Sequence, residues 1–237
     1  MFCKVLFTML GREKEIGSIN CLMSKNKNII LFGEEGVGKT EIVQSLLSEQ
    51  SNRRNLYVQE NETLRHTLLG IIASGSKEIS KGIDALNILA LKKKCYEIIS
   101  KTSDYIILDH MGRAEPKHYA FLTYLVEKNI PLLIVSRGLD KKAIGHLRMA
   151  IYGFEKVEIN NFDRAASNNL TDYFMKEFGI KVTKEAEFKQ AIFNYSRGNS
   201  KIIKGLCFFA RDVKYQKSGG LDVKLMDLDR RISEAVH

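Results

Sequence analysis

Short apolar runs bounded by turn-forming residues recur up to about residue 160 of the chain. They predict five buried strands, at Asn28–Phe32, Asn55–Gln59, Tyr105–Asp109, Pro131–Ser136 and Lys156–Ile159. Segments with the period of amphipathic helices precede and separate them, at Arg12–Met23, Lys39–Glu49, Glu62–Ala73, Asp84–Lys101, Lys117–Lys128 and Lys141–Ile151. Apolar strands that alternate with such helices are typical of a parallel sheet covered on both faces. The pattern therefore predicts an α/β fold with a doubly wound parallel five-stranded sheet.

The pattern changes near Asn160, after which helical periodicity continues without strand-like runs. Asp163 is a suitable N-cap for the first of these helices. The expected helices are Asp163–Lys176, Lys184–Tyr195, Ser200–Lys214 and Leu221–Ala235, and Lys217–Gly220 has the composition of a flexible loop. We therefore expect two domains, an α/β core over residues 1–160 and a C-terminal helical lid domain over residues 161–237.

The composition is that of an ordinary folded protein, since 44% of the 237 residues are hydrophobic and 27% are charged. No apolar run approaches the ~20 residues of a membrane-spanning helix. The N-terminus lacks the basic start and cleavage site of a signal peptide, so we expect a cytoplasmic protein. None of the cysteines forms a CxxC pair or has metal-ligand spacing, and we expect buried free thiols at Cys3, Cys21, Cys95 and Cys207.

The formal net charge of +9 is spread evenly along the chain. From Asn160 onward 14 Lys and Arg stand against 10 Asp and Glu, a balance of +4, and the remainder has 23 against 18, or +5. An even excess is compatible with contact to DNA or RNA through a folded surface. It is equally compatible with a solvated basic surface, so charge alone leaves DNA binding open.

The apolar run Ile29–Phe32 leads directly into Gly-Glu-Glu-Gly-Val-Gly-Lys-Thr, after which a helical segment begins. This fits the phosphate-binding loop pattern GxxxxGK[ST] in its strand–loop–helix context. Glycines let the backbone turn its N–H groups toward phosphates, and the following helix presents its positive end to them. Lys39 is expected to reach the β- and γ-phosphates and the Thr40 hydroxyl to bind Mg²⁺. The predicted nucleotide-binding residues here are Gly33, Glu35, Gly36, Val37, Gly38, Lys39, Thr40 and Glu41.

The side chains of Glu34 and Glu35 add negative charge to this loop. An inward carboxylate would repel the phosphates, so we expect both side chains to point to solvent.

The apolar run Tyr105–Leu108 ends in Asp109, which is the Walker B pattern. Asp109 is expected to hold the Mg²⁺ shell together with Thr40, so these two residues are the predicted metal ligands. His110 follows and can accept a proton near neutral pH, which makes it the candidate base for water activation. Glu115 is a weaker alternative.

The run Pro131–Val135 ends in Ser136-Arg137. In a P-loop domain this strand end lies beside the γ-phosphate, where Ser136 or Arg137 can detect whether that phosphate is present. Arg137 suits an anion because its guanidinium makes paired hydrogen bonds to phosphate oxygens.

The segment Leu10–Ile16, Leu-Gly-Arg-Glu-Lys-Glu-Ile, resembles the GRE segment that precedes the P-loop in many AAA+ and STAND ATPases, archaeal-type members included. With the Walker A loop, the Walker B strand and the sensor strand in the same order, the resemblance extends over nearly the whole chain. It implies that residues around Phe7–Gly11 line the adenine pocket. Many AAA+ enzymes carry glutamate at the position of His110, so we expect slow hydrolysis here.

Ser196–Ile203 resembles the G-N-P-R lid segment of AAA+ ATPases of the secretion and transposition type. The match implies that Lys201 is the sensor 2 residue that contacts the γ-phosphate, with lysine in place of arginine and Ser200 in place of proline. An AAA+ ring also needs an arginine finger that acts across subunits. Arg148 is the candidate for this role and Arg113 the alternative.

The resemblance implies that ATP·Mg²⁺ binds between core and lid and that loss of the γ-phosphate changes the lid angle, and with it assembly or partner contact. A homo-oligomer is expected, and no membrane partner. Three functions stay open: an ATPase that regulates a partner in a DNA transaction, a STAND-type signalling switch, and a nucleotide-binding structural subunit without turnover. The predicted catalytic residues are Lys39, Asp109, His110, Arg137 and Arg148.

Overall fold

A computed structural model describes residues 10–50, 53–76, 82–102, 104–217 and 220–236. These residues form two compact units. The first comprises residues 14–34 and 39–159, and the second joins residues 160–236 with residues 10–13 and 35–38. The expected domains 1–160 and 161–237 stay a prediction.

The first unit is built on a five-stranded parallel sheet with the order β2-β3-β4-β1-β5. In this sheet Leu31 pairs with Val135 on one side and with Val157 on the other. The strands are β1 (Ile29–Phe32), β2 (Asn55–Val58), β3 (Tyr105–Met111), β4 (Leu132–Ser136) and β5 (Glu155–Glu158). The predicted α/β fold is confirmed.

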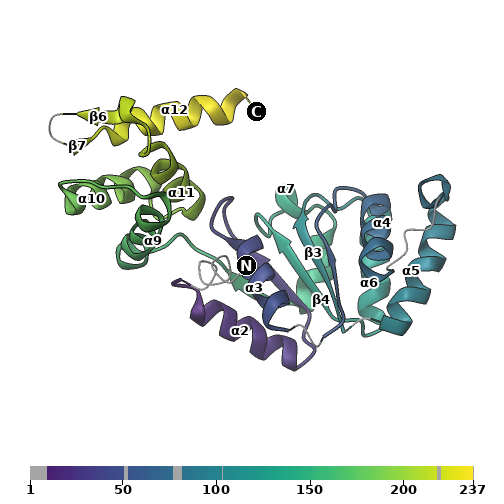
Figure 1. The fold of residues 1–237 in the computed structure, drawn as a ribbon. Helices are drawn as coiled ribbons and strands as arrows, with labels where there is room; N and C mark the ends of the chain where they lie inside the picture. The colour runs from purple at the N-terminus through teal and green to yellow at the C-terminus, as the bar shows by residue number, and fades with distance from the viewer. Residues whose placement is uncertain (1–9, 51–52, 77–81, 103, 218–219, 237) are drawn as a thin grey trace. The chain divides into compact units, whose positions relative to one another are not determined.

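Helices cover both faces of this sheet, with α4, α5 and α6 on one side and α2 and α3 on the other (Figure 1). Alternate strand residues such as Ile30, Leu108 and Ile134 are fully buried in the cluster that includes α4, α5 and α6. The helices are α2 (Glu13–Ser24), α3 (Lys39–Glu49), α4 (Leu64–Gly75), η1 (Ile83–Ala85), α5 (Ile88–Thr102), α6 (Pro116–Glu127), α7 (Lys141–Ile144), α8 (Leu147–Ala150) and η2 (Ile151–Gly153).

Two expectations for this unit are wrong. The strand expected to be buried at the end of the core, β5, lies at the sheet edge, and Glu155, Lys156 and Glu158 are exposed. The single helix expected over Lys141–Ile151 is divided at Gly145, which has φ +60. A side chain there would meet the Ala114 carbonyl at 2.8 Å, so the break is fixed by tertiary packing.

In the described residues of the second unit, the chain forms four α-helices, which are α9 (Arg164–Phe178), α10 (Glu185–Ser196), α11 (Ser200–Phe209) and α12 (Val223–Val236). The Asp163 carboxylate accepts from Ala166 N at 2.8 Å, which confirms the predicted N-cap of α9. Phe174 and Phe178 stack with their centroids 5.5 Å apart in a core that α9, α10, α11 and α12 share.

The expectation that strands cease after Asn160 is wrong, because β6 (Gln216–Lys217) pairs antiparallel with β7 (Gly220–Leu221). The helix expected over Ser200–Lys214 ends at Phe209, and a 3₁₀ turn, η3 (Val213–Tyr215), follows. The middle of the expected loop, residues 218–219, lies outside the described residues.

Every helix in the part of the chain that the structure describes is too short or too polar to cross a lipid bilayer. The thiols of Cys95 and Cys207 are free and buried, as expected, and burial raises the pKa of each to about 12. Cys21 is free but exposed, so the expectation of burial is wrong there. Cys3 lies outside the described residues.

Candidate functional site

The loop between β1 and α3 has the backbone that its glycines predict. Gly33, Gly36 and Gly38 have φ values of +154, +82 and +96. A Cβ atom on Gly33 would overlap the carbonyl oxygen of Ile159 on the neighbouring strand end. Only glycine fits there, and its missing side chain lets the loop leave β1 close to β5.

Lys39 lies at the first residue of α3 with its ammonium turned back over the start of the loop. Its Nζ donates to Gly33 O and to Glu34 O, both at 2.7 Å. These bonds hold a positive charge at the N-terminal end of α3, where anions bind favourably. Glu41 is exposed in the first turn of the same helix.

Asp109 is fully buried at the end of β3 and its carboxylate is held by two donors. Tyr57 OH donates to Oδ2 at 3.0 Å, and the backbone N–H of His110 donates to Oδ1 at 2.8 Å. Burial, followed by the charge and hydrogen bond of Asp109, raises the pKa of Tyr57 to about 12. Tyr57 therefore stays a proton donor to the carboxylate at neutral pH.

β3 contains a bulge between Leu108 and Met111, and Asp109 and His110 lie in it. Leu108 pairs with Ile134 but Met111 pairs with Ser136, so β3 holds one more residue than β4 over this stretch. His110 takes φ +55, which is uncommon for a residue other than glycine. The bulge turns its imidazole outward, with 61% of the side chain exposed, instead of into the buried cluster.

The bulge brings His110 to the loop. Its Nε2 lies 3.2 Å from Thr40 Oγ1 and 3.8 Å from Asp109 Oδ2. Thr40 and Asp109, the two predicted metal ligands, thus both approach one imidazole. A hydroxyl and a carboxylate suit Mg²⁺, which keeps several waters and takes the rest of its shell from phosphates.

A network of buried hydrogen bonds holds the backbone carbonyl of Asp109, and the sequence analysis did not predict it. Asn61 Nδ2 donates to Asp109 O at 2.6 Å and to Val58 O at 2.9 Å. Thr67 Oγ1 lies 3.3 Å from Asn61 Oδ1 and 2.9 Å from His118 Nε2. Asn61 follows β2, and its role depends on β2 being the neighbour of β3. In the sequence, the only sign of this role is that Asn61 is a polar residue just after a predicted strand.

His118, the last residue of this hydrogen-bond network, is expected to make the stability of the folded protein depend on pH. It is 1% exposed, and burial lowers its pKa to about 4. The unfolded chain, with an ordinary histidine pKa, binds the proton first, so the stabilising effect of the neutral form is complete above pH 6.5 and declines as pH falls toward 4. Urea titrations should show a loss of about 2 kcal/mol at pH 5 that His118→Gln removes.

The matched control for this prediction is His66→Gln, at an exposed position on α4. It should keep the wild-type difference between pH 7.5 and pH 5. An unchanged pH dependence in His118→Gln would contradict the prediction.

The remaining predicted core residues lie at different places. Ser136 is buried and its Oγ donates to Gly138 O at 2.9 Å. Arg137 follows it, exposed, at the end of β4 beside the bulge, because Ser136 pairs with Met111. Arg148 is exposed on α8. Arg113 is exposed before α6, and its Cγ lies so close to Gly145 that a Cβ atom added there would meet it. No described contact joins either arginine to the loop.

In the second unit, Lys201 lies at the start of α11 with its Nζ 3.1 Å from Glu35 Oε1. The Glu35 side chain is 55% exposed, so it faces solvent while pairing with Lys201. Gly11, with φ +77, packs against Phe162, whose ring would meet an added Cβ at 3.2 Å. Residues Phe7–Met9 of the expected base pocket lie outside the described residues.

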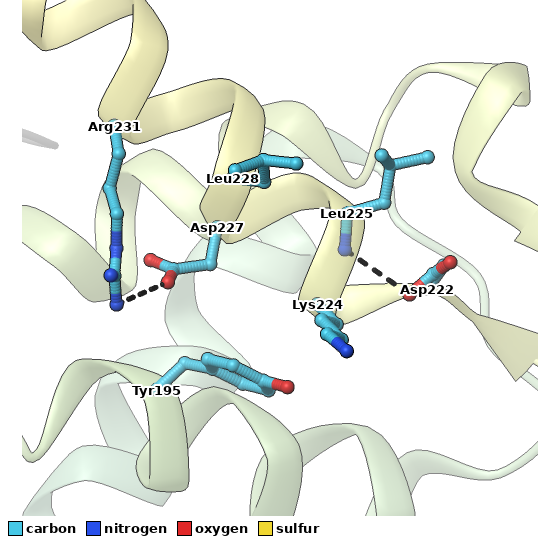
Figure 2. A pocket seen from close by; sticks show the side chains of 7 residues that line it. All are labelled: Tyr195, Asp222, Lys224, Leu225, Asp227, Leu228 and Arg231. Atoms are coloured by element: carbon cyan, nitrogen blue, oxygen red, sulfur yellow. Dashed lines mark hydrogen bonds and ion pairs between the residues drawn. The ribbon is translucent and has the colours of Figure 1, made fainter.

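A separate hollow of about 350 Å³ in the second unit lies between α10 and α12 (Figure 2). Asp227 Oδ2 pairs with Arg231 at 2.7 Å, and Asp222 Oδ1 accepts from Leu225 N at 3.2 Å. None of the residues predicted for the nucleotide site lines this hollow. Its walls are Tyr195, Asp222, Lys224, Leu225, Asp227, Leu228 and Arg231.

A glycine loop between β1 and α3, followed by Lys39 and by a Thr40 hydroxyl that lies beside His110 at the end of β3, defines a P-loop nucleotide-binding fold. The family model for the AAA domain of the dynein-related subfamily matches residues 28–150, more than half of the chain, and the chain belongs to this family. The predicted membership of the AAA+ P-loop ATPases is confirmed. No curated protein matches the chain in sequence.

Solved structures share the fold at low identity. Orc1 of Aeropyrum pernix, in complex with DNA, is 14% identical over 96% of this chain and 68% of that one, with a TM-score of 0.70. A Walker-type ATPase of Pyrococcus abyssi is 13% identical over 95% and 72%, with a TM-score of 0.66. AMPPCP-bound DnaA of Aquifex aeolicus is 18% identical over 76% of this chain and 54% of that one, with a TM-score of 0.51.

Proposed function

We propose that this protein is an AAA+ ATPase that binds ATP with Mg²⁺, hydrolyses it slowly and regulates a partner in a DNA transaction. The proposal rests on one observation. Thr40 and Asp109 both approach His110, next to a glycine loop whose first carbonyl accepts from the Lys39 ammonium. Oxygen ligands and a lysine at these positions suit a nucleotide triphosphate and its cation.

Each residue has a distinct part in the proposed reaction. Inward N–H groups of the loop and Lys39 bind the phosphates, which replace Gly33 O and Glu34 O as partners of the ammonium. Asp109, oriented by Tyr57, and Thr40 would hold Mg²⁺. The bound cation would neutralise charge on the β- and γ-phosphates. His110 accepts a proton from the attacking water.

The proposed switch lies at Lys201. Its ammonium pairs with Glu35 at 3.1 Å in an exposed ion pair, which contributes little to stability and exchanges readily. A γ-phosphate carries more charge than a carboxylate and competes for the same lysine. Binding and loss of that phosphate would therefore change the partner of Lys201 and with it the lid.

A DNA partner is supported by a fold shared with Orc1, which was solved with DNA, and the net charge of +9 is compatible with it. Anisotropy of labelled duplex DNA should show binding that needs a non-hydrolysable ATP analogue and weakens steeply with salt. Light scattering of the same samples should show a homo-oligomer with the analogue. DNA binding that is absent, or indifferent to nucleotide, would contradict the DNA role. An unchanged monomer would contradict assembly.

A second candidate is a nucleotide-binding subunit without turnover. His110 favours it, because a histidine with an exposed side chain stands where many AAA+ enzymes carry glutamate. Sustained Mg²⁺-dependent phosphate release, lost in His110→Ala, would exclude this candidate.

A further inference from the structure

Three consecutive carbonyls at the tip of the glycine loop accept hydrogen bonds from the unit that contains the tip. Asn199 Nδ2 donates to Glu35 O at 2.8 Å, and Ser200 Oγ donates to Gly36 O at 2.6 Å. Gly36 O also accepts from the backbone N–H of Lys201 at 3.0 Å. Arg12 Nη2 donates to Val37 O at 3.0 Å. Each tip carbonyl from residue 35 to residue 37 is therefore held.

Arg12 is itself fixed. It is 5% exposed, and its Nη2 also donates to Asn160 O at 2.7 Å. Its guanidinium lies over the Phe162 ring, 3.9 Å from the centroid, which is close cation–π contact. A buried guanidinium with a stacked face and a bonded edge has little freedom, so its bond to Val37 O has a defined direction.

Asn199 is fixed by the turn before α11. Gly198 O accepts from Phe162 N at 2.9 Å, and a Cβ atom on Gly198 would overlap Phe162 O. The side-chain Oδ1 of Asn199 accepts from Ile202 N at 3.3 Å as the N-cap of α11. Because the oxygen is committed to the cap, the amide nitrogen is left to face Glu35 O.

Holding these carbonyls also fixes the N–H groups of the loop. A trans peptide is planar, and the C=O of one residue points opposite to the N–H of the next. With the carbonyls of residues 35–37 held toward residues of the second unit, the N–H groups of Gly36, Val37 and Gly38 point the opposite way. Successive N–H groups on one side of such a loop form an anion-binding concavity.

We propose that the side chains of Arg12, Asn199 and Ser200 form a loop-tip clamp that orients the phosphate-binding N–H groups from outside. They are positioning residues that act through the backbone of the loop. The inference rests on the proposed nucleotide binding and extends it to three residues outside the GxxxxGK[ST] pattern. A loop already held in its binding conformation loses less entropy when the ligand arrives.

The clamp and a γ-phosphate sensor predict different effects of mutation on the affinities for ADP and ATP. The N–H groups that the clamp orients bind phosphates present in both ADP and ATP. Arg12→Ala should therefore lower the affinity for each nucleotide about tenfold, which corresponds to about 1.4 kcal/mol. Asn199→Ser keeps a hydroxyl that can cap α11 but is too short to reach Glu35 O, and it should give the same pattern. Lys201→Ala should weaken ATP more than ADP.

The experiment is calorimetric titration of the whole chain with ADP and with a non-hydrolysable ATP analogue. Arg164→Ala and Asn169→Ser, at exposed positions of α9, are the matched controls. In parallel, ¹⁵N relaxation of the Gly36 and Gly38 amides is measured without nucleotide. The clamp predicts rigid amides in wild type and mobile ones in Arg12→Ala and Asn199→Ser, with thermal unfolding recorded for each variant.

Equal losses for ADP and ATP, together with mobile tip amides, support the clamp. Wild-type affinities in both variants, or a loss confined to ATP, would overturn it while leaving the proposed function intact. If wild type binds neither nucleotide, the proposed function fails, and the relaxation data then decide whether the clamp holds the tip. Rigid amides in both variants would overturn the clamp under any binding result.

Discussion

Replacing Lys39 with alanine is expected to lower the affinity for ATP about a hundredfold or more. The substitution removes the ammonium that Gly33 O and Glu34 O hold at the start of α3. A charge-assisted hydrogen bond from an ammonium to a phosphate oxygen is about twice as strong as a bond between neutral groups. Two such contacts, to the β- and γ-phosphates, account for the expected loss, which is about 2.7 kcal/mol.

Calorimetric titration with ATP and Mg²⁺ measures this loss directly. The matched control is Lys93→Ala, at an exposed position of α5 that removes the same charge from the chain. It should bind ATP as wild type does. If Lys39→Ala binds ATP with wild-type affinity, the Lys39 ammonium has no part in nucleotide binding.

Replacing Asp109 with asparagine is expected to abolish the effect of Mg²⁺ on ATP binding. The change keeps the size of a fully buried side chain and an oxygen that can accept from Tyr57. It removes the negative charge that a divalent cation needs beside Thr40. Mg²⁺ should raise ATP affinity in wild type but not in Asp109→Asn, and phosphate release should fall about a hundredfold.

Titrations with ATP in EDTA and in Mg²⁺ separate cation binding from folding. Asp84→Asn, at an exposed position in η1, is the control and should keep the full Mg²⁺ effect. Equal stimulation by Mg²⁺ in Asp109→Asn and wild type would remove this carboxylate from the proposed cation site.

The sequence predicted α3 with both ends correct, Lys39–Glu49. Its first residue was predictable because the glycine loop before it fixes where the chain can become helical. The approach of Thr40 to the end of β3 followed from the same motifs, since parallel strands end at one edge of the sheet. Local pattern and tertiary fold agree at these positions.

Other features depend on neighbours that sequence periodicity does not identify. The break at Gly145 follows from contact with Ala114, about thirty residues earlier in the chain. The exposure of β5 follows from its place at the sheet edge. Tyr57 and Asn61 contact Asp109 only because β2 lies beside β3. Arg12 lies 25 positions before the loop carbonyl that it contacts, and Asn199 lies 164 positions after its own, so the two segments that resemble family motifs gave no sign that these side chains hold the loop.

The bulge in β3 has a consequence for transferring this site to another protein. In a regular strand, successive side chains alternate between the two faces, so the residue after a site-facing aspartate would enter the hydrophobic interior. Here the additional residue leaves Asp109 buried and the His110 side chain 61% exposed. Grafting only the two side chains onto an unbulged strand would bury an imidazole. A functional copy would require the backbone irregularity as well.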